Sequence, residues 1–203
     1  MLADELSEHR RELLLRRVRQ LPRPAAIRAA LDRYVVGQDQ AKRALAVQAY
    51  NHYKRLAWGI LQRGVPGPCK ANVLLTGPTG SGKTHLVATL ARQLEVPFAV
   101  VDATTLTGAG GGSAGPEAIA HALLRDCDWD AAMAGRGVVY LDELDKLAEA
   151  DDQGRGTAAQ EALLSCLEGR AVTVARANGR CVDVNTADIL FVAGGSFHGC
   201  ALP

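Results

Sequence analysis

The sequence predicts an α/β fold in three layers, with a parallel sheet between two layers of helices. From residue 71 onward, short apolar segments that suit buried strands alternate with segments of helical spacing. This alternation favours a parallel sheet, because each return to a neighbouring parallel strand needs a long connection, usually a helix. A glycine-rich loop follows the first strand, and two adjacent acids end a later one. Both features suit a site at the carboxyl ends of the strands.

The expected elements follow in order along the chain. The first 70 residues read as a charged helix at 3–20, a second helix at 25–34 that Pro24 can start, and a third at about 38–61. Core strands are expected at 71–76, 98–102, 137–141 and 189–193, and helices from the glycine-rich loop to residue 94, at 117–127 and at 158–168. Residues 172–174 and 181–184 read as a hairpin joined through Asn178 and Gly179.

The glycine-rich loop has the complete pattern G-x-x-x-x-G-K-[ST] of a phosphate-binding loop. Its glycines let successive backbone N–H groups turn toward a polyphosphate, and the following helix presents its positive end to the same group. Lys83 supplies a charge for the terminal phosphates, and the Thr84 hydroxyl is placed to coordinate Mg²⁺. The predicted nucleotide-binding residues of this segment are Gly77, Pro78, Thr79, Gly80, Ser81, Gly82, Lys83, Thr84 and His85.

The second half of the predicted site is the pair Asp142 and Glu143, which ends an apolar strand. In a nucleoside triphosphatase the first acid holds Mg²⁺, mostly through water, and the second accepts a proton from the attacking water. We therefore expect Asp142 and Thr84 as metal ligands, and Glu143 and Lys83 as catalytic residues. The alternative is an ordinary strand that ends at two solvated acids.

The composition limits the classes of protein to which the chain can belong. Its 203 residues are 48% hydrophobic and 22% charged, which is ordinary for a soluble globular protein. The net charge of +1 gives no electrostatic reason to expect nucleic acid or a membrane as a partner. The five cysteines form no C-x-x-C pair, so neither a zinc site nor a redox motif is indicated. An acidic start and the lack of a long apolar run favour a cytoplasmic protein.

The basic N-terminal helix leaves two interpretations open. Residues 3–20 carry five arginines, and such a face is either solvated or binds a partner.

From about residue 21 to residue 197 the chain resembles the AAA+ module of the ClpX family, whose members are ATP-driven protein unfoldases that feed a peptidase. The segments that carry the resemblance are 21–24, 34–38, 51–56, 102–107, 141–146, 162–169 and 189–195. The resemblance implies a three-layer AAA+ large ATPase domain over residues 21–203, preceded by the charged helix of residues 1–20. It also implies ATP and Mg²⁺ as cofactors, Val35 and Val36 as residues that pack on the adenine, and a first sensor region near Gly194 and Gly195.

The segments that face the substrate in this family differ here. The family grips protein substrates with a pore loop of the pattern Gly-Tyr-Val-Gly, whereas residues 110–113 read Gly-Gly-Gly-Ser. A second pore loop, at 148–156, is shortened, and the basic pore-entry loop is missing from the hairpin at 176–180. Glycines offer neither bulk nor a fixed backbone. The sequence therefore predicts ATPase chemistry with impaired substrate translocation.

The resemblance also sets expectations for the segments that the family carries beyond the position of residue 203. The family's arginine finger, peptidase-docking loop, fifth strand and small domain are not within the sequence, so the large domain is expected to be incomplete. We then expect the chain by itself to hydrolyse ATP slowly and not to dock to a Clp-type peptidase. We also expect an open sheet edge at strand 71–76. ATP and ADP are the expected ligands, with assembly into a ring with itself or with ClpX-like relatives. The alternatives are a nucleotide-dependent regulatory or assembly module, and a truncated fragment without function.

Overall fold

The computed structural model of the chain describes residues 20–61, 67–107, 115–148, 155–176 and 179–197. The predicted helix at 3–20 lies outside these residues apart from its last position, as do most of the two segments assigned to pore loops. The chain forms two compact units, residues 1–71 and 72–203.

The described residues of the N-terminal unit form the helices α2 (Pro24–Asp32) and α3 (Asp39–Leu61), close to the predicted bounds. Pro24 begins α2, where its missing N–H costs no helical hydrogen bond. The buried Leu31 of α2 and Leu45 of α3 belong to the core of this unit. Lys42 is 3% exposed and donates at 2.8 Å to Asp32, whose side chain is 42% exposed, so a buried ammonium is paired with a carboxylate at the surface.

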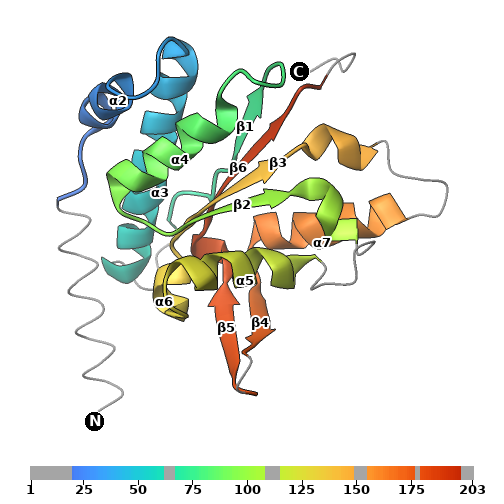
Figure 1. Cartoon of the computed structure of the whole chain (residues 1–203). Helices are drawn as coiled ribbons and strands as arrows, with labels where there is room; N and C mark the ends of the chain where they lie inside the picture. Colours follow the sequence, from blue (N-terminus) through green and yellow to red (C-terminus); the bar gives the residue numbers. More distant parts are fainter. Residues whose placement is uncertain (1–19, 62–66, 108–114, 149–154, 177–178, 198–203) are drawn as a thin grey trace. The chain divides into compact units, whose positions relative to one another are not determined.

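A four-stranded parallel sheet forms the centre of the C-terminal unit (Figure 1). Its strand order is β1-β6-β3-β2, so the last of the described strands lies between the first of them and the strand that ends in Asp142. The strands are β1 (Val73–Thr76), β2 (Phe98–Asp102), β3 (Val138–Asp142) and β6 (Leu190–Gly195), and the helices that pack on them are α4 (Lys83–Leu94), α5 (Pro116–Asp126) and α7 (Arg155–Glu168). All four strands and all three helices were predicted. The first strand is shorter than predicted, because residues 71 and 72 are not part of it.

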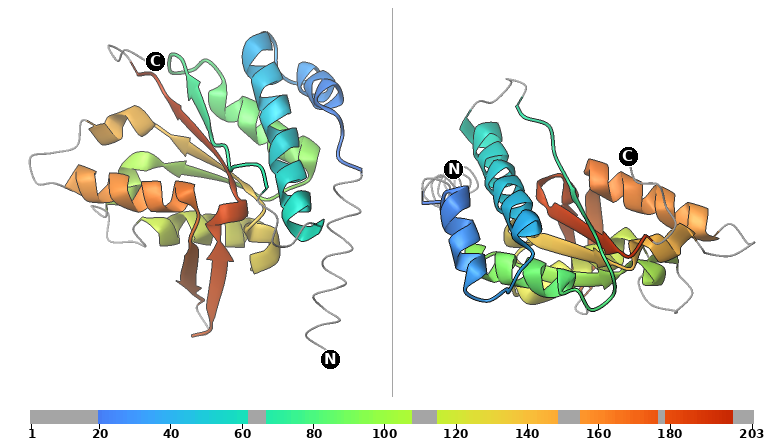
Figure 2. Two further views of the ribbon diagram at one scale, coloured as in Figure 1. Left: turned by 180° about the vertical axis from the view of Figure 1, so that it is seen from behind. Right: turned by 90° about the horizontal axis from the view of Figure 1, so that it is seen from above.

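Helices of the C-terminal unit lie on both faces of this sheet (Figures 1 and 2). On one face, alternate strand residues such as Val101, Leu141 and Phe191 share a core with Leu123 of α5 and Leu163 of α7. The other face carries the intervening residues and packs against α4. The three-layer α/β architecture is therefore as the sequence predicts.

The remaining described elements are short. The hairpin β4 (Ala171–Ala175) and β5 (Cys181–Asn185) pairs antiparallel, with Val172 opposite Val184, which confirms the prediction. The turns η1 (Ala103–Thr107), η2 (Leu144–Ala148) and η3 (Thr186–Asp188) and the helix α6 (Ala131–Ala134) connect the larger elements. Among the described strands, β1 pairs with β6 alone, so it is the sheet edge that was expected.

Candidate functional site

The glycine-rich loop connects the end of β1 to the start of α4. Gly80 and Gly82 have φ angles of 80° and 87°, in the left-handed region that glycine adopts without strain. Gly82 is the N-cap of α4 and makes no side-chain cap, so it leaves room in front of the helix. The first N–H groups of a helix have no partner within it. The loop therefore directs a row of N–H groups and the positive end of a 12-residue helix to one place.

Lys83, the first residue of α4, folds back over this loop. Its Nζ donates to the carbonyl oxygens of Gly77 at 2.6 Å and Pro78 at 3.0 Å. These two contacts hold the ammonium at the start of the loop. An anion in the loop would meet this charge directly.

Thr84 and Asp142 are 58 residues apart in the sequence and meet in the fold. The Thr84 hydroxyl donates to Oδ2 of Asp142 at 3.3 Å, and Oδ1 of the same carboxylate accepts from the backbone N–H of Glu143 at 3.0 Å. A hydroxyl and a carboxylate are oxygen ligands of the kind that Mg²⁺ prefers. No group of three or more His, Cys, Asp or Glu side chains suited to a metal occurs among the described residues. Mg²⁺ itself takes only one or two protein ligands and completes its shell with phosphates and water.

Tyr140 adds a third side chain to this group. Its hydroxyl donates to Oδ1 of Asp142 at 3.4 Å. Burial raises the pKa of Tyr140 to about 12, and the charge of Asp142 acts in the same direction, whereas a hydrogen bond with Thr84 opposes the shift. The phenol therefore keeps its proton at neutral pH and serves as a donor.

Glu143, the predicted base, follows directly after β3. Its φ of 55° places a residue other than glycine in the left-handed region, where backbone strain is common at functional sites. Its carboxylate accepts from Lys146 Nζ at 2.6 Å, and Lys146 N–H donates to the Glu143 carbonyl at 3.0 Å. The bond to Glu143 raises the pKa of Lys146. The Glu143 carboxylate is partly exposed and forms an ion pair with Lys146, three residues further along the chain.

The comparison with protein-family models decides the family. Residues 69–202 match the model described as AAA domain (Cdc48 subfamily). The chain belongs to this AAA family. The match spans the whole site just described, from the strand before the glycine-rich loop to the strand beside Asp142.

Two curated relatives of this chain carry the same name. The chain is 46% identical over 191 residues to the "ATP-dependent Clp protease ATP-binding subunit ClpX" of Porphyromonas gingivalis, which covers 88% of this chain and 46% of that protein. It is 43% identical over 197 residues to the protein of the same name from Bacteroides fragilis, covering 90% and 46%. The expected ClpX-like AAA+ resemblance is confirmed. The chain spans about half the length of these relatives.

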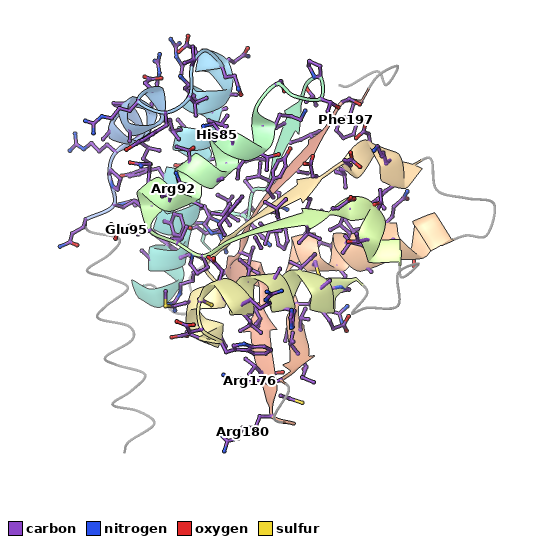
Figure 3. The ribbon with its side chains drawn as sticks, viewed as in Figure 1. His85, Arg92, Glu95, Arg176, Arg180 and Phe197 are labelled. Carbon is purple, nitrogen blue, oxygen red and sulfur yellow. The ribbon has the colours of Figure 1, made fainter. Side chains whose placement is uncertain are left out.

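The other predicted nucleotide-binding residues lie in two places. Pro78, Thr79 and Ser81 are exposed along the loop, and His85 is exposed in the first turn of α4 (Figure 3). Val35 and Val36 belong to the N-terminal unit, where Val35 is buried and Val36 is 97% exposed. Their contact with adenine stays a prediction.

Besides Tyr140, two residues beside the site, Asp145 and Lys146, were missed by sequence reasoning. Lys146 could have been found from its spacing of three to Glu143, which brings side chains together in a helical turn. Asp145 had no local signal, because its partners are 51 and 52 residues away. Its Oδ2 accepts from the Ser196 hydroxyl at 2.6 Å and from the backbone N–H groups of Ser196 and Phe197, both at 3.2 Å. The Ser196 hydroxyl, ahead of the backbone N–H groups, lowers the pKa of Asp145.

Among the described residues of the AAA domain and the N-terminal unit, no helix is both long enough and apolar enough to cross a membrane.

Proposed function

We propose that this AAA domain binds ATP with Mg²⁺ and hydrolyses it. The observation that carries the proposal is the meeting of Thr84 and Asp142, with their oxygens 3.3 Å apart beside the phosphate-binding loop. The relatives named ATP-binding subunits are 46% and 43% identical to this chain over 88% and 90% of its length. Both observations support nucleotide binding through Gly77–Thr84.

The loop supplies most of the binding. Backbone N–H groups of the glycine-rich loop and of the first turn of α4 would donate to the phosphates. Lys83 would exchange the carbonyls of Gly77 and Pro78 for phosphate oxygens, which bear more negative charge. Val35 and Val36 would pack on the adenine, as the resemblance implies.

The acids at the end of β3 would supply a metal ligand and the catalytic base. Thr84 and Asp142 would hold Mg²⁺, which neutralises charge on the phosphates when bound. Glu143 would orient a water molecule and take its proton, because a carboxylate close to the phosphates can act as a general base. That step requires the Glu143 carboxylate to leave Lys146, and exposed ion pairs of this kind are weak enough to open readily.

The binding half of the proposal is tested by Lys83→Ala. A fluorescent ATP analogue should bind the wild-type chain with Mg²⁺ and bind the variant roughly 10-fold to 150-fold more weakly, since a charge-assisted contact is worth about 1.5–3 kcal/mol. Lys54→Ala, in α3, is the matched control and should bind like wild type. Equal binding to wild type and Lys83→Ala would show that the site is wrongly assigned.

The catalytic half is tested by Glu143→Gln. The amide cannot take a proton, so the variant should keep its affinity for ATP and lose turnover. Phosphate release is the measurement. A variant that hydrolyses ATP as fast as wild type would remove Glu143 from the mechanism.

A second candidate function is a nucleotide-dependent assembly or regulatory subunit that joins ClpX-like relatives in a ring without pulling substrate. The sequence Gly-Gly-Gly-Ser at 110–113 favours it, although these residues lie outside the described part of the chain. Glycines there would absorb a loop movement in their own backbone dihedrals and offer little contact area.

Transplanting the loop tests this second candidate. In a full-length ClpX-like host, the Gly-Gly-Gly-Ser loop should leave ATPase activity intact and stop the unfolding of a tagged reporter. The reverse change, Gly111→Tyr, Gly112→Val and Ser113→Gly in that loop, should restore unfolding. Full-rate unfolding with the Gly-Gly-Gly-Ser loop would refute the idea.

A further inference from the structure

Tyr140 is the one tyrosine of β3, and it lies two residues before Asp142. Side chains two apart in a strand point to the same face of the sheet. This face packs against α4, whose first turn carries Thr84. Tyr140 is 0% exposed, yet its hydroxyl lies within hydrogen-bonding distance of the Asp142 carboxylate. A core residue therefore reaches the edge of the candidate site.

Gly194 in β6 makes room for this phenol. Val192 pairs with Tyr140 and Ala193 with Leu141, so Gly194 is the next residue along β6, level with Asp142. A Cβ built on Gly194 would overlap the Tyr140 hydroxyl oxygen and lie 2.5 Å from Cζ and 2.9 Å from Cε2. Gly194 has an ordinary strand conformation, so glycine is required here for space and not for its backbone freedom.

The phenol thus occupies the place of a side chain at position 194. From there its hydroxyl lies between the strand of the glycine-rich loop and the strand of the acids, since β6 separates β1 from β3. Asp142 then has donors on both oxygens: Tyr140 and the Glu143 N–H on Oδ1, and Thr84 on Oδ2. Because Tyr140 and the Glu143 N–H both bind Oδ1, the other oxygen, Oδ2, faces the Thr84 hydroxyl.

A tyrosine that served packing alone would not need this hydroxyl. Phenylalanine fills nearly the same volume without a polar atom to satisfy, and a buried hydroxyl without a partner is costly. The hydroxyl of Tyr140 is instead turned to the carboxylate that the proposed function makes a metal ligand. Groups that hydrogen-bond a ligating carboxylate orient it and tune its affinity for the metal.

We propose that Tyr140, fitted over Gly194, is a positioning residue that fixes the Asp142 carboxylate for Mg²⁺. This inference rests on the proposed function, because it takes Thr84 and Asp142 as the residues that hold the metal. It assigns to the pair Tyr140 and Gly194 a part in metal affinity, separate from the binding of the nucleotide itself by the glycine-rich loop.

The test measures the affinity of the full chain for a fluorescent ATP analogue, once in excess EDTA and once with saturating Mg²⁺. The ratio of the two dissociation constants is the gain in affinity linked to Mg²⁺. Tyr140→Phe should leave the constant in EDTA unchanged and reduce the gain about tenfold, the lower end of what such outer contacts contribute. Tyr53→Phe, at a buried tyrosine of the N-terminal unit, is the matched control and should keep the wild-type ratio.

Gly194→Ala is the second variant, and it decides the matter if Tyr140→Phe fails to fold. Its Cβ should push the phenol off Asp142 and reduce the gain in the same direction. A folded Tyr140→Phe or Gly194→Ala protein with the wild-type ratio would overturn the inference, provided that Thr84→Val loses the gain. No Mg²⁺-linked gain in the wild-type chain would instead overturn the proposed function, and this inference with it.

Discussion

Replacing Asp145 with asparagine should destabilise the C-terminal unit by about 1–2 kcal/mol at neutral pH. Oδ2 of Asp145 accepts three hydrogen bonds from residues 196 and 197, which hold the end of β6 against the turn after β3. A hydrogen bond to a charged group contributes about 1.5–3 kcal/mol when it is well buried. Asp145 is only partly buried and its three donors share one oxygen. Contact with water therefore makes the total stabilisation smaller than the sum of three buried hydrogen bonds.

The pH dependence of this effect separates it from a general loss of packing. The hydrogen bond from Ser196, with the backbone N–H groups, lowers the pKa of Asp145 below its ordinary value. The stabilisation is therefore fully present above an ordinary carboxyl pKa of about 4 and is lost as the pH falls through the lowered native value. The difference between wild type and Asp145→Asn should be largest at pH 7 and should shrink below about pH 4.

Urea unfolding followed by circular dichroism from pH 7 to pH 3 is the assay. Glu161→Gln, which removes an exposed carboxylate of α7, is the matched control and should change the free energy of unfolding by less than about 0.5 kcal/mol. A free-energy difference for Asp145→Asn that is the same at pH 7 and pH 3, or absent at pH 7, would refute the reasoning.

Further predictions concern the base and two glycines. Lys146→Met should leave the affinity for ATP unchanged and raise kcat by no more than about fivefold, because it frees Glu143 from a weak exposed ion pair; a fall in kcat in a phosphate-release assay would contradict this. Gly137→Ala should lower the free energy of unfolding by about 1–3 kcal/mol, since its Cβ would lie 2.7 Å from Leu123 Cδ2 and 2.8 Å from the Pro97 carbonyl oxygen. Gly59→Ala, in α3 with nothing within 4 Å of the new Cβ, should instead stabilise by about 0.5 kcal/mol, and a destabilised variant in urea unfolding would be unexpected.

Local patterns predicted most of the fold. The strands and helices were expected within a few residues, because apolar periodicity and the glycine-rich loop are features of neighbouring residues. The order of the strands was not derivable in this way. β6 pairs with both β1 and β3, and nothing within residues 190–195 records which distant strands it joins.

In the candidate site, too, local motifs predict some features and long-range packing sets the others. Lys83, Thr84, Asp142 and Glu143 belong to motifs of fixed spacing, and the fold brings Thr84 and Asp142 together as expected. Other contacts beside this group join residues far apart in the chain, such as Asp145 with Ser196 and Phe197. The fit of Tyr140 over Gly194 depends on strand register and close packing, which no short motif encodes.

The central claim is that the glycine-rich loop and the acidic strand end form one site for a nucleotide and its metal. The most direct test is the crystal structure of this chain with Mg²⁺ and a slowly hydrolysed ATP analogue. We expect the terminal phosphates within residues 77–84, in contact with Lys83, and the metal bound to the Thr84 hydroxyl with Asp142 beside it. A nucleotide bound elsewhere, or a metal without contact to Thr84 or Asp142, would contradict the claim.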